Sequence, residues 1–143
     1  MTTSSGTTRN LDWLLDDLLN RLPGIESAVV LSTDGMLISK SSSLTRDSAE
    51  QFCAMASALQ GLARSAGGHF GVGGVRQSVI ELDRAMLFVT SAGDNACLAV
   101  LADDTTNMGM VAYEMNQTVT SVGSFLSTGT RPHPGNDMGY RLP

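Results

Sequence analysis

GIESAVVLSTDGMLISKS, residues 24–41, holds two short apolar and β-branched runs on either side of the turn Asp34-Gly35. An Asp-Gly pair between two such runs is a strong hairpin signal, because glycine takes a positive φ without a Cβ clash. We therefore predict a β-hairpin with strands at residues 25–32 and 36–40.

A second β-rich region begins at residue 75 and contains three runs: VRQSVIEL (75–82), AMLFVTSA (85–92) and ACLAVLA (96–102). The links between them are hairpin-sized, which predicts an antiparallel meander. The last two runs are almost continuously apolar, as in strands that are covered on both faces. The first mixes polar and apolar residues, a composition that favours a strand at the edge of the sheet.

The remaining segments predict three helices. Leucines at helical spacing follow Asn10, a good N-cap residue. A long helix is expected to begin near Thr45 or Asp47, and Asp47 with Glu50 three residues later resembles a capping box. The last helix is expected to begin at about residues 105–107.

The predicted order of elements is α-β-β-α-β-β-β-α, which indicates an α+β fold. We expect one five-stranded antiparallel sheet, with one long helix on one face and two helices on the other. The Thr/Ser-rich residues 1–8 are predicted to be disordered, residues 9–127 to form the domain, and residues 128–143, rich in Pro and Gly, to form a flexible tail.

The middle helix has an unusually wide apolar face. Its segment FCAMASALQGLA, residues 52–63, has no charged residue, and only Gln60 interrupts an apolar arc of roughly half the circumference. Since a stripe of about 100° covers one partner, we predict that this helix packs on its own sheet and also on a second subunit. A helix buried in the centre of one subunit is the alternative. The predicted interface residues of the helix are Ala49, Phe52, Cys53, Met55, Ala56, Leu59, Leu62, Ala63 and Ala66.

Composition excludes several classes of function. The formal net charge of −5 and the scattered Lys and Arg residues argue against binding to nucleic acid. No apolar run approaches the ~20 residues of a membrane-spanning helix, and the N-terminus lacks the features of a signal peptide. We therefore expect a cytoplasmic protein without membrane insertion. Cys53 and Cys97 are interpreted as small buried hydrophobes.

No catalytic, cofactor or metal motif is present in the sequence. The glycine-rich segment GGHFGVGG, residues 67–74, follows a predicted helix and precedes a predicted strand, the reverse of a phosphate-binding loop. His69 and His133 have no second ligand at metal-binding spacing. The sequence therefore predicts a protein that is not an enzyme and that binds no cofactor.

The hairpin at 24–41, the small-residue helix and the meander VIELDRAMLFVTSAGDNACLAVLAD (79–103) together resemble the roadblock/dynein light chain family. The similarity covers about residues 9–127, and it is greatest to the bacterial and archaeal branch found beside Ras-like GTPases, including the gliding-motility GTPase-activating partner. The resemblance implies the profilin-like roadblock fold. It also implies a homodimer in which the middle helices pack together and the first meander strands join edge to edge. The strand residues of that interface would be Val75, Gln77, Val79 and Glu81.

The same resemblance implies a non-enzymatic signalling protein that binds a Ras-like small GTPase, and it suggests a sensor-kinase-like protein as a further partner. It leaves open whether the protein activates GTP hydrolysis or only docks the GTPase. Four arginines are candidates for contacts with the partner because we expect them to be exposed: Arg46, Arg64, Arg76 and Arg84. The alternative is a ligand-sensing module of the PAS or profilin-like kind, which would require an internal cavity with convergent polar groups.

Overall fold

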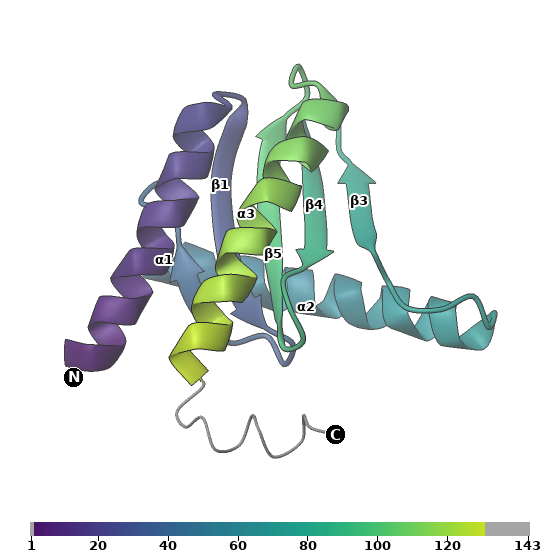
Figure 1. Cartoon of the computed structure of the whole chain (residues 1–143). Coiled ribbons are helices and arrows are strands. Elements are labelled where there is room, and N and C mark those ends of the chain that lie inside the picture. Colours follow the sequence, from purple (N-terminus) through teal and green to yellow (C-terminus); the bar gives the residue numbers. More distant parts are fainter. Residues whose placement is uncertain (1, 131–143) are drawn as a thin grey trace, which may run out of the picture.

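The structure of the chain, a computed structural model, describes residues 2–130 (Figure 1). It contains three helices and five strands in the predicted order, which confirms the α+β fold class. The elements are α1 (Thr2–Arg21), β1 (Ile25–Ser32), β2 (Leu37–Lys40), α2 (Arg46–His69), β3 (Gln77–Glu81), β4 (Ala85–Ser91), β5 (Ala96–Asp103) and α3 (Met108–Thr130).

The five strands form one antiparallel sheet in the order β2-β1-β5-β4-β3. The strand β1 of the hairpin and the strand β5 of the meander therefore lie side by side in the middle, and β2 and β3 are the two edges. The prediction that the first meander strand lies at an edge is confirmed. Gly35, in the turn between β1 and β2, has a φ of 91°, as the Asp-Gly pair predicted.

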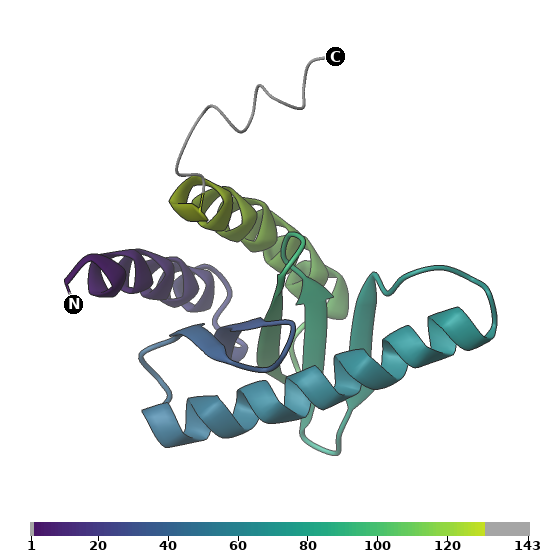
Figure 2. The ribbon, with the colours of Figure 1, turned by 90° about the horizontal axis from the view of Figure 1, so that it is seen from below.

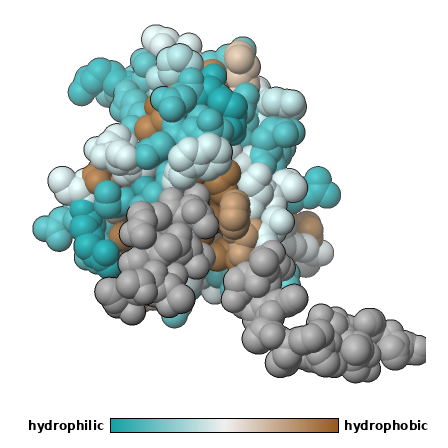
Figure 3. Space-filling view, turned by 60° about the vertical axis from the view of Figure 1, so that its left-hand side comes forward, coloured by the Kyte–Doolittle hydropathy of each residue, from teal (hydrophilic) through white to brown (hydrophobic). Residues whose placement is uncertain are grey.

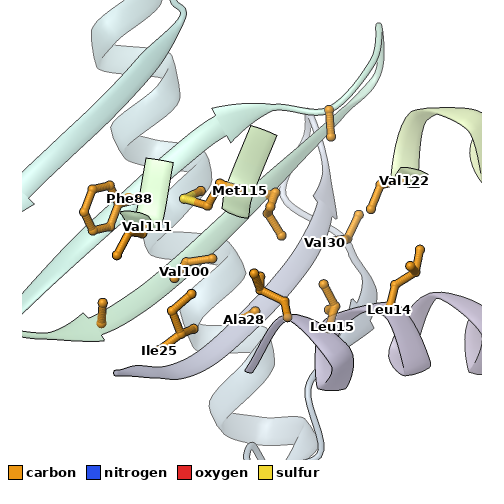
Figure 4. Packing of buried hydrophobic residues seen from close by; sticks show 14 of the residues in the cluster. Leu14, Leu15, Ile25, Ala28, Val30, Phe88, Val100, Val111, Met115 and Val122 are labelled. Carbon is orange, nitrogen blue, oxygen red and sulfur yellow. The ribbon is translucent and has the colours of Figure 1, made fainter. Parts of the chain in front are cut away.

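The helices are divided between the two faces of the sheet, as predicted. Helices α1 and α3 lie side by side on one face, and α2 crosses the other face (Figures 1 and 2). The core between the sheet and the α1–α3 pair is formed by leucines of α1, by β-strand residues such as Phe88 and Val100, and by Val111, Met115 and Val122 of α3 (Figure 4). Val29, Leu31, Val89 and Ala99 form the smaller core under α2.

Helix α1 begins earlier than the sequence predicted. The structure places residues 2–8, expected to be disordered, in the helix, and Asn10 lies inside it rather than at its N-cap. Once a helix is nucleated, each further residue adds a hydrogen bond without a second nucleation cost, so polar residues of modest propensity can extend it. Helix α3 likewise continues to Thr130, past the predicted boundary at residue 127. The rest of the predicted tail, residues 131–143, lies outside the described residues.

Helix α2 is capped by Thr45. The backbone N–H of Ser48 donates a hydrogen bond of 3.1 Å to the Thr45 hydroxyl oxygen, which satisfies one of the free donors of the first turn. Of the two predicted starts, Thr45 is confirmed and the capping box of Asp47 and Glu50 is wrong. The Glu50 carboxylate accepts instead from the Arg46 guanidinium at 3.0 Å, one turn away.

Carboxylates of α1 cover the β2 edge of the sheet. Asp12 accepts hydrogen bonds from the backbone N–H of Lys40, at 3.0 Å, and from the Ser39 hydroxyl. Asp16 accepts from the backbone N–H and the hydroxyl of Ser42, at 2.8 and 2.6 Å. The surface seen from the α1 side is mostly hydrophilic (Figure 3). Because the outward N–H of Lys40 already has a partner and side chains of α1 lie over this edge, β2 is a poor template for another strand.

Candidate interaction surface

The predicted interface residues of α2 divide into two groups. The first group faces inward: Ala49, Phe52, Cys53 and Ala56 are buried in the core between α2 and the sheet. The side chains of Ala49, Cys53 and Ala56 are therefore occupied within one chain, whereas Phe52 also lines the apolar groove described below. Part of the wide apolar arc is explained by ordinary packing on the sheet.

The second group faces outward and remains exposed. Met55 is 59 % exposed, Leu62 is 70 % exposed, and Ala66 is also exposed, whereas Leu59 and Ala63 are half-buried. The helix also runs past the β3 edge of the sheet, so that its C-terminal part overhangs on that side (Figures 1 and 2). An apolar helical face that its own sheet does not cover is typical of an interaction site.

Gln60 fixes where α2 crosses the edge strand. Its side chain is buried, the Ser78 hydroxyl of β3 donates to its Oε1 at 2.9 Å, and its Nε2 lies 3.8 Å from Cys97 Sγ of β5. The sequence predicted this residue only as an interruption of the apolar arc. Its role as a polar contact between α2 and the sheet could not be identified without knowing that Ser78 lies opposite.

The backbone of β3 presents hydrogen-bonding groups to solvent along the free edge. Leu82 N–H donates to the Ala85 carbonyl at 2.8 Å, so Leu82 faces β4. Because hydrogen-bonded and non-bonded pairs alternate along an antiparallel ladder, Gln77, Val79 and Glu81 direct their N–H and C=O groups away from β4. The predicted residues at 77, 79 and 81 are therefore the ones at which another strand could pair.

The side chains of these strand residues do not join the exposed face of α2. Val79 is paired with Phe88, which belongs to the core under α1 and α3, whereas Ser78 contacts Gln60 of α2. Since alternate residues point to opposite faces, the side chains at 77, 79 and 81 lie on the α3 side of the sheet. Val75 precedes the strand, which begins at Gln77.

An apolar groove of about 260 Å³ lies on the α2 side of the sheet. It runs between the N-terminal half of α2 and the strands that α2 leaves uncovered. Its lining includes Phe52 and Met55 from the helix, Leu87 and Leu101 from the sheet, and Leu82 directly after β3. Met55 thus belongs both to the exposed helical face and to this groove, which makes the two one continuous apolar surface.

The four candidate arginines are exposed, but they do not form one patch. Arg46 and Arg64 are 18 residues apart on α2, which corresponds to about 27 Å along a helix. Arg76 and Arg84 flank opposite ends of β3. Arg64 lines a separate cleft of about 400 Å³ together with Asp34 and Asp94.

The two thiols have no chemistry of their own in this arrangement. Burial, and to a smaller extent the nearby Glu50 carboxylate, raises the pKa of Cys53 to about 11. Burial also raises the pKa of Cys97, against smaller opposing effects of Gln60 and Arg64. Both are therefore protonated at neutral pH and are poor nucleophiles. Among residues 2–130 no cluster of three or more His, Cys, Asp or Glu residues could hold a metal ion.

No helix within the described part of the chain has the length and apolar character needed to cross a bilayer. Three exposed features lie next to one another in the described residues: the outer face of α2, the groove beside it and the free edge of β3.

Comparisons with known proteins agree with the resemblance found in the sequence. The profile of the Roadblock/LC7 domain matches residues 11–102. A solved Roadblock/LC7 domain from Streptomyces avermitilis is 47 % identical, with a TM-score of 0.78 over 80 % of this chain and 96 % of that one. An uncharacterised protein of Methanocaldococcus jannaschii is 31 % identical over 104 residues, 73 % of this chain and 86 % of that protein.

MglB of Myxococcus xanthus has the same fold at 14 % identity, with a TM-score of 0.75 over 83 % of this chain and 96 % of that one. The profile match and the two closer relatives cover most of the sheet and the helices that position the surface described above. The chain belongs to the Roadblock/LC7 domain family.

Proposed function

We propose that this protein is a non-enzymatic homodimer that binds a Ras-like small GTPase and either modulates its GTPase cycle or docks it to a signalling complex. The single observation that supports the proposal best is the coincidence of two unpaired features on one side of the domain. The C-terminal part of α2, with the exposed Leu62, overhangs the sheet where the β3 edge is free, and the exposed Met55 continues this apolar face toward the groove.

A second copy of the chain suits both features at once. Backbone groups along β3 can be satisfied by the same strand of a twin subunit, which also removes an aggregation-prone edge. The overhanging part of α2 would then lie beneath the partner's sheet, where the apolar groove of Leu82, Leu87 and Leu101 is uncovered. A two-fold axis makes these contacts reciprocal, since each copy supplies the same surface.

We propose a GTPase as the partner because the chain belongs to this family. In addition, the described residues offer no catalytic or metal-binding group that would favour another function. The buried thiols are protonated, the arginines are dispersed, and no metal cluster is present among residues 2–130. A dimer of this kind would act on a GTPase by favouring one arrangement of its switch loops rather than by supplying a catalytic group. The candidate arginines would then serve as contacts with the GTPase.

The direct experiment is a binding measurement between the purified chain and the Ras-like small GTPases of the same genome, each loaded with GDP or with a non-hydrolysable GTP analogue. We expect binding that depends on the nucleotide, since the switch loops differ between the two states. Absence of binding in either state, for every such GTPase, would contradict the proposal.

A single-turnover GTP hydrolysis assay with saturating protein then separates the two versions of the function. Acceleration supports an activating role, and an unchanged rate with retained binding supports docking. The variant Arg84→Ala, which alters an exposed arginine beside the proposed strand interface, can be compared with Arg46→Ala, which alters an arginine that pairs with Glu50 at the far end of α2.

A further inference from the structure

We infer that the C-terminal end of α2, residues 61–69, exchanges between helix and coil in a single chain and is held in the helical state by association. This inference rests on the proposed homodimer for the identity of the partner. It adds a regulatory step, because the end of the helix must fold before its overhanging face can make contacts. The burial of the segment, its glycine content and the space around those glycines support it.

The end of α2 has no side chain anchored in its own domain. The last buried residue of the helix is Gln60, which contacts Ser78 of β3. Every residue from 61 to 69 is exposed or half-buried, and Leu62 is 70 % exposed. This part of the helix extends beyond the edge of the sheet (Figure 2). Segments with few buried apolar contacts and exposed backbone hydrogen bonds open locally at low cost.

Three glycines lower the intrinsic stability of the same segment: Gly61, Gly67 and Gly68. Within a helix, each glycine reduces the equilibrium constant for helix formation about 5-fold relative to alanine. Residues 46–60 already form a nucleus, so the segment can gain or lose turns from its C-terminus without a new nucleation cost. Packing on the sheet does not offset the glycines here, and the helical end is therefore only weakly stable in one chain.

Two of these glycines are not required by the geometry of the single chain. A Cβ atom added at Gly61 or Gly68 would meet no atom within 4 Å, and neither residue has a positive φ. Gly67 differs, because a Cβ there would lie 2.1 Å from the carbonyl oxygen of Gly73. Alanine would therefore fit at positions 61 and 68, and the effect of glycine at both is to favour the coil.

A partner that covers the overhanging face would reverse this balance. Leu62 joins the apolar face of α2 only while the segment is helical, so a second subunit that buries this side chain binds the helical state better. The apparent affinity is then reduced by the fraction of chains whose segment is helical before binding. The helix–coil equilibrium of residues 61–69 thus regulates how tightly two copies associate.

Hydrogen exchange of the full-length chain, followed by mass spectrometry below and above the dimer Kd, tests the coupling. We expect peptides from residues 61–69 to exchange rapidly in the dilute sample and to be protected in the concentrated one. Residues 52–60 should be protected in both. Strong protection of residues 61–69 in a dilute, monomeric sample would overturn the inference. Rapid exchange of the segment in a concentrated sample that light scattering shows to be dimeric would also overturn it.

The double variant Gly61→Ala, Gly68→Ala provides a second measurement. It raises the helical population of the segment in the free chain, and we expect the dimer Kd to fall by at least about 5-fold. The matched control is Gly123→Ala in α3, where an added Cβ also meets no atom within 4 Å, and its Kd should equal that of the native chain. A double variant with the native Kd would contradict the inference.

The outcomes separate this inference from the proposed homodimer. A dimer whose Kd does not respond to the two alanines, and whose helix end is equally protected at all concentrations, would overturn the inference and leave the homodimer in place. A native chain that light scattering shows to be monomeric at every concentration would overturn the homodimer, and the coupling would fall with it.

Discussion

At the scale of single residues, the position of α2 depends on one buried amide. Gln60 lies in an otherwise apolar helical face, and its carbonyl oxygen accepts from Ser78 of the edge strand at 2.9 Å. Because a buried polar group without a partner is costly, this contact favours one position of the helix over the sheet. That position determines how far the helix overhangs β3, and therefore which of its side chains its own sheet leaves exposed.

Replacement of Gln60 tests this role. We expect Gln60→Ala to lower the free energy of unfolding by about 1–3 kcal/mol, through the lost hydrogen bond and the cavity that the side chain leaves. Gln51→Ala, at an exposed position of the same helix, is the matched control and should change stability by less than about 0.5 kcal/mol. Urea denaturation measures both. Equal losses in the two variants would show that Gln60 has no special role.

The buried thiol of Cys53 predicts a dependence of stability on alkaline pH. Its pKa is raised from an ordinary value of 9.0 to about 11 in the folded chain, chiefly by burial. Below pH 9 the thiol is protonated in both states, and its contribution to stability is fully present. Between pH 9 and 11 only the unfolded state loses the proton, so the free energy of unfolding should fall as the pH rises.

Denaturant titrations from pH 8 to pH 11 measure how the free energy of unfolding changes with pH in the native chain and in Cys53→Ala. The variant should lose stability less steeply over that range, although Cys97, whose pKa is also raised, keeps part of the slope. Identical slopes in the two proteins would mean that the Cys53 thiol does not contribute.

At the scale of elements, the two edges of the sheet differ in what covers them. The β2 edge is covered by side chains of α1, and the β3 edge is left free beside the overhang of α2. An association that uses only one edge closes on itself as a dimer, whereas two free edges would permit an open chain of subunits. In the proposed dimer, Asp12 and Asp16 of α1 would thus favour association through the β3 edge by covering the other one.

Asp12→Ala tests the covered edge. The variant leaves the Lys40 N–H and the Ser39 hydroxyl without their acceptor, and we expect a loss of about 1–3 kcal/mol in the free energy of unfolding. We also expect species larger than a dimer in light scattering, since the strand edge becomes available. The exposed Asp104→Ala is the control. An Asp12→Ala protein as stable as the control, with an unchanged mass, would contradict this role.

Much of the element order could be predicted because its signals are local. The Asp34-Gly35 turn and the alternation of apolar runs determine the hairpin and the meander, and the mixed composition of residues 77–81 placed that strand at an edge. The start of α2 could be predicted only as a choice between Thr45 and Asp47. Capping depends on which of several polar residues has the right backbone angles, and Thr45 rather than Asp47 has them.

The surface was predicted only in part, because burial depends on contacts that are distant in sequence. The apolar arc of α2 contains both the residues that pack on the sheet, such as Ala56, and those that remain exposed, such as Leu62. The sequence could not separate them without the angle at which the helix crosses the strands. Similarly, the pairing of Asp12 with β2 joins residues that are 28 positions apart.

At the scale of the whole molecule, the two faces of the sheet differ in how far helices cover them, and the α2 face is the incomplete one. Helices α1 and α3 cover one face together, whereas α2 alone crosses the other and leaves an apolar groove beside it. The free β3 edge adjoins this incomplete face. One twin subunit could cover the groove and pair with the β3 edge at the same time. The proposed dimer therefore accounts for two features that are unrelated within a single chain.

The most direct test of the dimer is its mass in solution, measured by light scattering coupled to size-exclusion chromatography for the native chain and two variants. We predict a mass near twice the 15.0 kDa of one chain. Leu62→Asp, which places a charge on the overhanging face of α2, should give the mass of a monomer. Met110→Asp, an equally drastic change at an exposed residue of α3 on the opposite face, should stay dimeric. A native chain with the mass of one subunit, or a Leu62→Asp protein that remains a dimer, would contradict the account.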